Sequence, residues 1–339
     1  MEKVVVIGAG VMGSALAIHL GNNGHNVNLW GTQWDDKALD QMKETKENKI
    51  LGAKIPDNIS FYYHDQMEEA FKDTKLVVIA VISKGIETMS QTIAKYINDN
   101  HVVLSITKGI DGDSLDTMST VITNNMPETS KGKMSIVKLG GGLIAAEIAN
   151  GVYSEGIFAS EDLEAAEYVR DMFKSDKFRG EVSGDIQGVD LCAAFKNSYA
   201  IGMGMIEGIE KGKDNPRAAL MARGAIEMAN IVEAYGGDRE TALGMAGVGD
   251  YYVTSQGGRN GQFGKLIGEG NTKDEALEIM EHQTVEGLAI TPNGYRFLKE
   301  LEKEGKINMK KDTPFFLEIY NILFNNKDVK EGIENYWKN

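Results

Sequence analysis

The chain has 339 residues, of which 42% are hydrophobic and 25% charged, and its formal net charge is −14 at pH 7. This composition is typical of a globular protein, and the length allows two domains with separate cores. The acidic balance argues against nucleic-acid binding, and an anionic ligand would need a few local cations to overcome the field of the whole protein.

Short β-branched runs alternate with helical patterns through the first half of the chain. Amphipathic stretches such as Ala15–Asn22 and Met89–Ile97 separate the runs that we expect to form strands. Strands that are apolar on both faces and separated by helices predict an α/β fold, a doubly wound parallel sheet of the Rossmann type with right-handed crossovers. The predicted strands are Val4–Ile7, Val27–Trp30, Leu76–Val81, Val102–Ile106 and Ser135–Leu139.

The pattern changes near residues 182–188, and the stretch from Asp190 to Tyr235 is predicted to be almost entirely helical. Within it, Asn215-Pro216 is interpreted as an N-cap followed by proline at the first helical position, and Gly236-Gly237 as a stop. Further helices are predicted to start at Thr272 and at Thr313-Pro314. The second of these is expected to bury Phe315, Phe316, Ile319, Tyr320 and Leu323.

A glycine-rich turn, Gly8-Ala9-Gly10-Val11-Met12-Gly13, directly follows the first predicted strand. Its first glycine permits a tight turn, its second lets a pyrophosphate approach the backbone, and its third lets helix and strand pack closely. The alternative is a glycine turn in a flavodoxin-like sheet. Because a strand precedes the turn and a helix follows it, we favour a dinucleotide site made by Gly8, Gly10, Val11, Met12 and Gly13.

These patterns predict a dinucleotide-binding domain over residues 1–184 and an all-α domain for substrate and catalysis over 185–339. The end of the second strand bears on the choice between NAD and NADP, because an acid there would bind the ribose 2′-OH and repel a 2′-phosphate. The sequence offers Thr32 at that place, and Asp35-Asp36 come only later. With neither an acid nor an arginine at the expected position, NADP is slightly favoured and both cofactors stay open.

Lys196 and Asn197 interrupt an apolar helical run, Leu191–Met203. A lysine in such surroundings is costly unless it is paired or functional, and burial lowers the pKa of a lysine toward the range useful for proton transfer. The alternative is a lysine on the solvated side of the helix. We therefore treat Lys196 as a candidate acid/base for a reaction that moves a hydride.

Other candidate residues lie in loops. Arg259-Asn260 stand in a glycine-rich stretch where an arginine fork suits phosphate oxygens, although a flexible surface turn explains the stretch equally well. Thr107-Lys108-Gly109 follow a strand's carboxyl end, where doubly wound sheets bind ligands. Asp250 is a possible partner for the lysine or a helix cap. Arg223 and Glu227, spaced i,i+4, are interpreted as an ion pair on a helix surface.

Several motifs occur in one order along nearly the whole chain, which resembles the NAD(P)-dependent glycerol-3-phosphate dehydrogenase family. So many motifs at compatible spacing are more specific than any one of them. They are Gly8–Gly13, Thr107-Lys108-Gly109, Phe195-Lys196-Asn197, Ala219-Leu220, Arg223-Gly224, Glu227-Met228, Gly244–Asp250, Arg259-Asn260, Phe263-Gly264 and Val285-Glu286-Gly287.

The resemblance implies hydride transfer between NAD(P) and sn-glycerol 3-phosphate or dihydroxyacetone phosphate, which feeds phospholipid synthesis. It implies that Lys196 transfers the proton, that Lys108 contacts substrate and cofactor, and that Asp250 orients the reacting end. The implied cofactor contacts also include Thr32, Ala145, Arg259, Val285 and Glu286. The implied substrate contacts are Lys108, Gly141, Lys196, Asn197, Asp250, Thr254, Arg259 and Asn260, with Arg259 and Asn260 on the phosphate.

The chain departs from the family pattern in two loops. The family's Ser-Gly-Pro-Ser/Thr-Phe-Ala loop is here Gly140–Ala145, with Leu143 in place of a hydroxyl residue. The family's Ser-Arg-Asn-Arg is here Gly258–Gly261, which lacks the second arginine. Both changes concern the substrate pocket. They keep open a dehydrogenase for another polyol phosphate or a hydroxy acid, and a nucleotide-binding sensor without catalysis.

The remaining expectations concern location and partners. No run approaches the roughly 20 apolar residues of a membrane span, and Met1 leads directly into Val4–Ile7 without room for a signal peptide. The single cysteine, Cys192, cannot form an internal disulfide, and the five histidines lack metal-ligand spacing. We therefore expect a cytoplasmic enzyme, a homodimer, that acts on a small phosphorylated substrate without metal, nucleic acid or membrane insertion.

Overall fold

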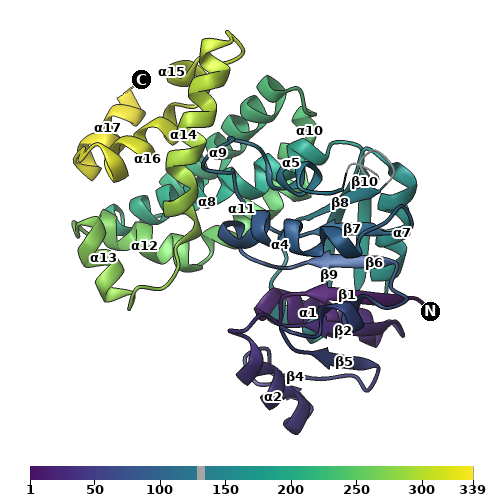
Figure 1. Cartoon of the computed structure of the whole chain (residues 1–339). Helices are drawn as coiled ribbons and strands as arrows, with labels where there is room; N and C mark the ends of the chain where they lie inside the picture. Colours follow the sequence, from purple (N-terminus) through teal and green to yellow (C-terminus); the bar gives the residue numbers. More distant parts are fainter. Residues whose placement is uncertain (128–133, 339) are drawn as a thin grey trace. The chain divides into compact units, whose positions relative to one another are not determined.

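A computed structural model describes residues 1–127 and 134–338, which form two compact units (Figure 1). Unit 1 comprises Met1–Lys108 and Met118–Ile186, and unit 2 comprises Gly109–Thr117 and Gln187–Asn339. The predicted first domain included residues 109–117, but side chains of unit 2 hold this segment. Asn293 and Arg296 donate hydrogen bonds to the carbonyl oxygens of Ile110 and Gly112, at 3.0 and 2.6 Å.

Unit 1 contains a sheet of eight described strands in the order β10-β9-β8-β7-β6-β1-β2-β5. All five predicted strands are present within one or two residues, and the neighbours from β5 to β8 pair in parallel. The prediction of a parallel sheet was wrong for one pair of strands, because β9 pairs antiparallel with β8. The bounds are β1 (Lys3–Ile7), β2 (Asn26–Trp30), β5 (Ile59–Tyr62), β6 (Leu76–Ile79), β7 (Val102–Ser105), β8 (Ser135–Gly140), β9 (Ser154–Ala159) and β10 (Phe178–Ser183).

The central strand β1 is buried on both faces. Val4 and Val6 pack in one core cluster, and Val5 and Ile7 pack in another on the opposite face, as the two-residue period of a strand requires. Its neighbours are β2 on one side and β6 on the other, so the strand order reverses at β1. In open α/β sheets such a switch point is where ligands bind, at the carboxyl ends of the strands.

Helices connect the strands of unit 1, and a two-stranded ribbon, β3 (Glu47–Asn48) and β4 (Ala53–Lys54), lies outside the sheet. The predicted helical stretch Ala15–Asn22 lies within α1, and Met89–Ile97 falls on α4 and a following 3₁₀ turn, Ala94–Tyr96. The bounds are α1 (Val11–Asn22), α2 (Asp36–Thr45), α3 (Met67–Phe71), a 3₁₀ turn (Ser83–Gly85), α4 (Ile86–Ile93), α5 (Met118–Asn124), α6 (Ala145–Ala149) and α7 (Leu163–Phe173).

Unit 2 is helical. Among the residues that the structure describes, no helix is both long and apolar enough to cross a membrane. The elements are α8 (Ile186–Ile209), α9 (Asp214–Tyr235), α10 (Arg239–Leu243), the π-helical turn η3 (Met245–Gly249), α11 (Asp250–Ser255), α12 (Arg259–Gly268), α13 (Lys273–Ile279), α14 (Glu286–Lys303), α15 (Met309–Asp312), α16 (Pro314–Phe324) and α17 (Val329–Lys338).

The predicted helix ends are mostly confirmed. Gly236 ends α9 with φ 102°, and Thr272 caps α13 in a capping box with Glu275. The predicted start of α9 was two residues late. The helix begins at Asp214, so Pro216 is its third residue, where a missing N–H costs no intrahelical bond.

The helix α16 begins at Pro314, directly after Thr313, as predicted. Four of its five expected core residues are buried. The exception is Tyr320, which is half-buried and stacks on Tyr295 of α14 with 3.7 Å between ring centroids.

Candidate active site

The glycine turn after β1 has the shape of a phosphate cradle. Gly8 adopts φ 106°, and an added Cβ there would lie 2.8 Å from the carbonyl oxygen of Ala80. A Cβ on Gly13 would lie 2.0 Å from the carbonyl oxygen of Gly8. At Gly10, which caps α1 without a side-chain hydrogen bond, a Cβ would meet nothing within 4 Å. The open approach to the helix N-terminus, where Val11 is exposed, fits the pyrophosphate of a dinucleotide.

The loop after β7 is fixed on both sides by neighbouring strands. The hydroxyl of Thr107 donates to the carbonyl oxygen of Val81 at 2.8 Å, beyond the end of β6. The carbonyl oxygen of Thr107 accepts a hydrogen bond from the ammonium of Lys138, which is fully buried in β8. Lys108, the predicted contact, follows in a half-buried position. Our sequence reasoning missed Lys138, although a lysine in an apolar strand is the same signal that singled out Lys196.

The loop after β8, Gly140–Ala145, is the first of the two loops that depart from the family pattern. Gly141 adopts φ 119°, a conformation that favours glycine, and the N–H of Leu143 donates to its carbonyl oxygen at 2.9 Å. The Leu143 side chain packs against the core of unit 1. Ala145 is the first residue of α6 and is buried. This loop therefore offers backbone groups, and no hydroxyl at position 143.

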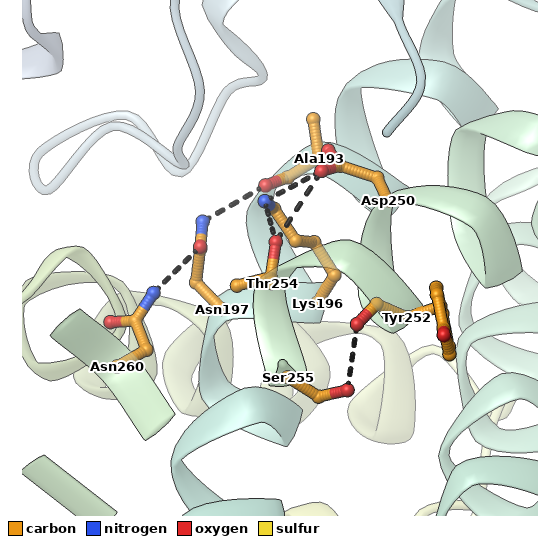
Figure 2. Close-up of polar contacts among 8 residues, drawn as sticks. All are labelled: Ala193, Lys196, Asn197, Asp250, Tyr252, Thr254, Ser255 and Asn260. Carbon is orange, nitrogen blue, oxygen red and sulfur yellow. Dashed lines mark hydrogen bonds and ion pairs between the residues drawn. The ribbon is translucent and has the colours of Figure 1, made fainter. Parts of the chain in front are cut away.

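Lys196 of α8 lies in a buried polar cluster with two residues of α11 (Figure 2). Its Nζ donates to Oδ1 of Asp250 at 2.8 Å and to Oγ1 of Thr254 at 2.5 Å. The lysine side chain is only 5% exposed and the Asp250 side chain 4%. Asp250 and Thr254 are spaced i,i+4, so one face of α11 presents both acceptors to the ammonium. The solvated lysine that we considered as an alternative is thereby excluded.

The π-helical turn η3 positions Asp250 beside Lys196. It spans Met245–Gly249 directly before α11, and π turns are often found at functional sites. Its tightness requires glycine, because a Cβ on Gly247 would lie 1.9 Å from the carbonyl oxygen of Ala242. The glycines of the Gly244–Asp250 motif thus permit the close backbone packing of η3, and this turn places the carboxylate of Asp250 beside Lys196.

A chain of amide hydrogen bonds joins three helices beside the lysine. Asn197 donates to the carbonyl oxygen of Ala193 at 3.1 Å and accepts from Nδ2 of Asn260 at 2.9 Å, as Figure 2 shows. Oδ1 of Asn260 in turn accepts from the N–H of Gly287, in the first turn of α14, at 2.9 Å. Both asparagines are buried. The predicted substrate residues Asn197 and Asn260 are thus brought together, next to the start of α14.

Glycines bring α8 and α12 into backbone contact, which places Asn260 beside Asn197. A Cβ on Gly204 of α8 would lie 2.1 Å from the carbonyl oxygen of Gly261. A Cβ on Gly264 of α12 would lie 2.0 Å from the carbonyl oxygen of Ile201. The i,i+4 partners Gly208 and Gly268 show the same crowding, at 2.3 and 2.1 Å from backbone oxygens of the facing helix.

The other predicted residues of unit 2 lie at helix starts. Arg259 is the first residue of α12 and is exposed, with Gly258 as a cap that makes no side-chain hydrogen bond. Val285 precedes α14 and is buried, whereas Glu286, the first residue of α14, is exposed. The structure places neither Arg259 nor Glu286 in the hydrogen-bonded cluster around Lys196.

The interpretation of Arg223 and Glu227 as a surface ion pair was wrong. Glu227 is buried and caps α16, accepting hydrogen bonds from the N–H groups of Phe315 and Phe316 at 2.7 and 3.0 Å. It also accepts from the hydroxyl of Tyr199 at 3.0 Å. Burial raises the pKa of Glu227 to about 7, against the opposing effect of these three donors.

The described residues contain no group of three or more His, Cys, Asp or Glu side chains arranged to hold a metal ion. Cys192 is buried in α8.

Both parts of the chain match models of one family. Residues 3–166 match the N-terminal part of NAD-dependent glycerol-3-phosphate dehydrogenase, and residues 185–334 match its C-terminal part. The NADP(+)-dependent glycerol-3-phosphate dehydrogenase of Archaeoglobus fulgidus is 33% identical, over 97% of each chain. A glycerol-3-phosphate dehydrogenase [NAD(P)+] of Thermoanaerobacter is 36% identical, over 98% of this chain and 95% of that protein.

Solved structures agree with these matches. The crystal structure of glycerol-3-phosphate dehydrogenase from Coxiella burnetii superposes with a TM-score of 0.85 and 26% identity, and covers 100% of this chain and 99% of that one. A glycerol-3-phosphate dehydrogenase from Saccharomyces cerevisiae has the same fold, with a TM-score of 0.82. The chain therefore belongs to the NAD-dependent glycerol-3-phosphate dehydrogenase family.

Proposed function

We propose that the chain interconverts sn-glycerol 3-phosphate and dihydroxyacetone phosphate with NAD(P), and that Lys196 is its acid/base. The observation that carries this proposal is the buried ammonium of Lys196 between Asp250 and Thr254, in a chain that matches the dehydrogenase family along both parts. A buried lysine is suited to proton transfer when its hydrogen-bond partners hold the ammonium in one orientation.

The reaction moves a hydride at C2 of the substrate and a proton at the oxygen bound to C2. The bound dinucleotide supplies or accepts the hydride. During reduction, Nζ of Lys196 donates a proton to the oxygen on C2, and during oxidation the neutral amine takes that proton back. Asp250, 2.8 Å from Nζ, stabilises the ammonium, and Thr254 fixes its direction. The low exposure of the pair strengthens each of these interactions.

The substrate phosphate would be bound at the start of α12. Arg259 has an exposed guanidinium there, and the uncapped first turn offers N–H groups to an anion. Asn260, held by Asn197 and Gly287, would add a side chain of fixed orientation. A local cation is needed, because the whole chain carries a net charge of −14.

The test combines two variants and a control. Lys196→Met should lower kcat by roughly 10²–10⁴-fold, the usual contribution of an acid/base, with the affinity for NADH unchanged. Arg259→Ala should raise KM for dihydroxyacetone phosphate about tenfold or more, since it removes binding in the ground state as well. Lys303→Met, on an exposed part of α14, is the matched control and should retain wild-type kinetics. Near-full turnover in Lys196→Met would contradict the assignment.

A second candidate substrate is a different polyol phosphate. Leu143, which packs on the core and offers no hydroxyl, favours it. A panel of polyol phosphates and the corresponding unphosphorylated alcohols, assayed by NADH and NADPH absorbance, decides between the two. If another phosphate has a higher kcat/KM than dihydroxyacetone phosphate, the substrate assignment falls and the acid/base assignment stands.

We also propose that the enzyme is a cytoplasmic homodimer. The chain has a single cysteine, Cys192, and therefore no internal disulfide, which suits a reducing compartment. Apolar side chains exposed on unit 2 would suit a contact between subunits; they include Ile226, Leu243, Tyr252, Ile279 and Trp337. Light scattering after size-exclusion chromatography tests the dimer, and a monomer at micromolar concentration would contradict it.

A further inference from the structure

The loop after β2 folds a carboxylate back to the end of the strand. Asp35 lies five residues beyond Trp30, the last residue of β2. Its Oδ2 accepts a hydrogen bond from the N–H of Thr32 at 2.8 Å and from the Thr32 hydroxyl at 2.7 Å. Asp35 is the N-cap residue of α2, but its side chain makes no capping bond to that helix. The carboxylate is committed to Thr32 instead.

This arrangement supplies the acid that the sequence lacked at the expected place. In dinucleotide-binding folds, an acid at the end of the second strand accepts the ribose 2′-OH and repels a 2′-phosphate. Asp35 brings a negative charge to that end from five residues away. It also occupies the N–H and the hydroxyl of Thr32, the two donors that a 2′-phosphate would otherwise receive there.

The surroundings add little to attract a second phosphate. Asp36 also lies in the first turn of α2, where it reduces the positive potential of the helix N-terminus, and its Oδ2 lies 3.3 Å from Nδ1 of His64. Lys37 and Lys43 of α2 are the cations closest in sequence, and Lys43 lies over the ring of Tyr63 at 5.8 Å. The first arginine of the whole sequence is Arg170.

We infer that Asp35 makes this chain selective for NAD(H) over NADP(H), an inference that rests on the proposed function of the glycine turn as a dinucleotide site. It reverses the slight preference for NADP that the sequence favoured. It also separates this chain from its relative in Archaeoglobus fulgidus, which is named as NADP(+)-dependent.

The test measures binding alone, by calorimetric titration of the wild-type protein and two variants with NADH and with NADPH. The wild type should bind NADH at least about tenfold more tightly, the effect of roughly 1.4 kcal/mol from one partly screened charge pair. Asp35→Asn keeps an acceptor for Thr32 and removes only the charge, so it should narrow the NADPH/NADH ratio of Kd values by about tenfold. Asp36→Asn, the neighbouring acid, is the matched comparison and should narrow that ratio clearly less than Asp35→Asn does, because its carboxylate lies against His64 and not against Thr32.

Each outcome bears on the inference. A wild type that binds NADPH as tightly as NADH overturns the selectivity, and an Asp35→Asn variant with the wild-type ratio overturns the role of Asp35. If the wild type and both variants bind neither nucleotide, the proposed dinucleotide site itself falls. That failure is distinguishable, because a wrong inference about Asp35 would still leave heat of binding with at least one nucleotide.

Discussion

Replacing Gly264 with alanine tests the close helix crossing on which the position of Asn260 depends. The new Cβ would lie 2.0 Å from the carbonyl oxygen of Ile201, where ordinary contact begins at 3.4 Å. The helices must therefore separate by up to 1.4 Å, which is 3.4 minus 2.0. A shift of that size would stretch the 2.9 Å bond between Asn260 and Asn197 well beyond hydrogen-bonding distance.

The energetic consequence follows from two opposing effects. Overpacking a tight contact costs about 1–3 kcal/mol, and a buried amide left without its partner costs about as much again. The higher helix propensity of alanine compared with glycine offsets only about 1 kcal/mol of this loss in stability. We expect Gly264→Ala to be less stable by about 3 kcal/mol, to unfold several degrees lower in calorimetry, and to show a raised KM for the phosphorylated substrate.

The control is Gly261→Ala, in the first turn of the same helix. A Cβ there meets only the carbonyl oxygen of Ser255, at 3.8 Å, so this variant should be as stable as the wild type or slightly more so. Gly268→Ala, which is crowded at 2.1 Å but two turns from Asn260, should lose stability with a smaller change in KM. If Gly264→Ala keeps the wild-type Tm and KM, the crossing does not position Asn260 and the reasoning fails.

Two further predictions concern buried polar groups. The pKa of Glu227 is raised to about 7 in the folded chain from 4.5, so the folded state binds the extra proton. Its contribution, of about 3 kcal/mol, is complete below pH 4.5 and is lost as the pH rises through 7, and Glu227→Gln should flatten the measured free energy of unfolding over that window. Single and double alanine variants of Asn197 and Asn260 should be non-additive by roughly 0.5–3 kcal/mol in denaturant unfolding, since they share one bond; simple additivity would show that the amide chain contributes nothing.

The sequence predicted the strands that are buried on both faces, because an apolar run is their signature. It missed strands with weaker patterns. β5 and β10 are the edges of the sheet, and in each only the first residue is buried, whereas β9 carries Gly156 in its middle. The antiparallel direction of β9 was also missed, because the local sequence of a strand does not encode the direction of its neighbour.

The residues of the site could be predicted where a charged side chain stands in an apolar stretch of sequence. Lys196 stood out as a charge in an apolar helix, and the structure places it with Asp250 and Thr254. Asp35 was passed over, since its role depends on a turn that folds it back to Thr32. Glu227 was misjudged for a similar reason. Its i,i+4 spacing fits a surface pair, but packing turns it toward the N-terminus of α16.

The amide chain from Gly287 through Asn260 and Asn197 to Ala193 has a single direction, with every N–H donating toward α8. It begins on a backbone N–H and ends on a backbone carbonyl oxygen, neither of which can exchange roles. The orientation of both side-chain amides is thereby determined by the main chain before any substrate arrives. A ligand that contacts Asn260 meets a group that need not rotate, so little of its binding free energy is spent on ordering the protein.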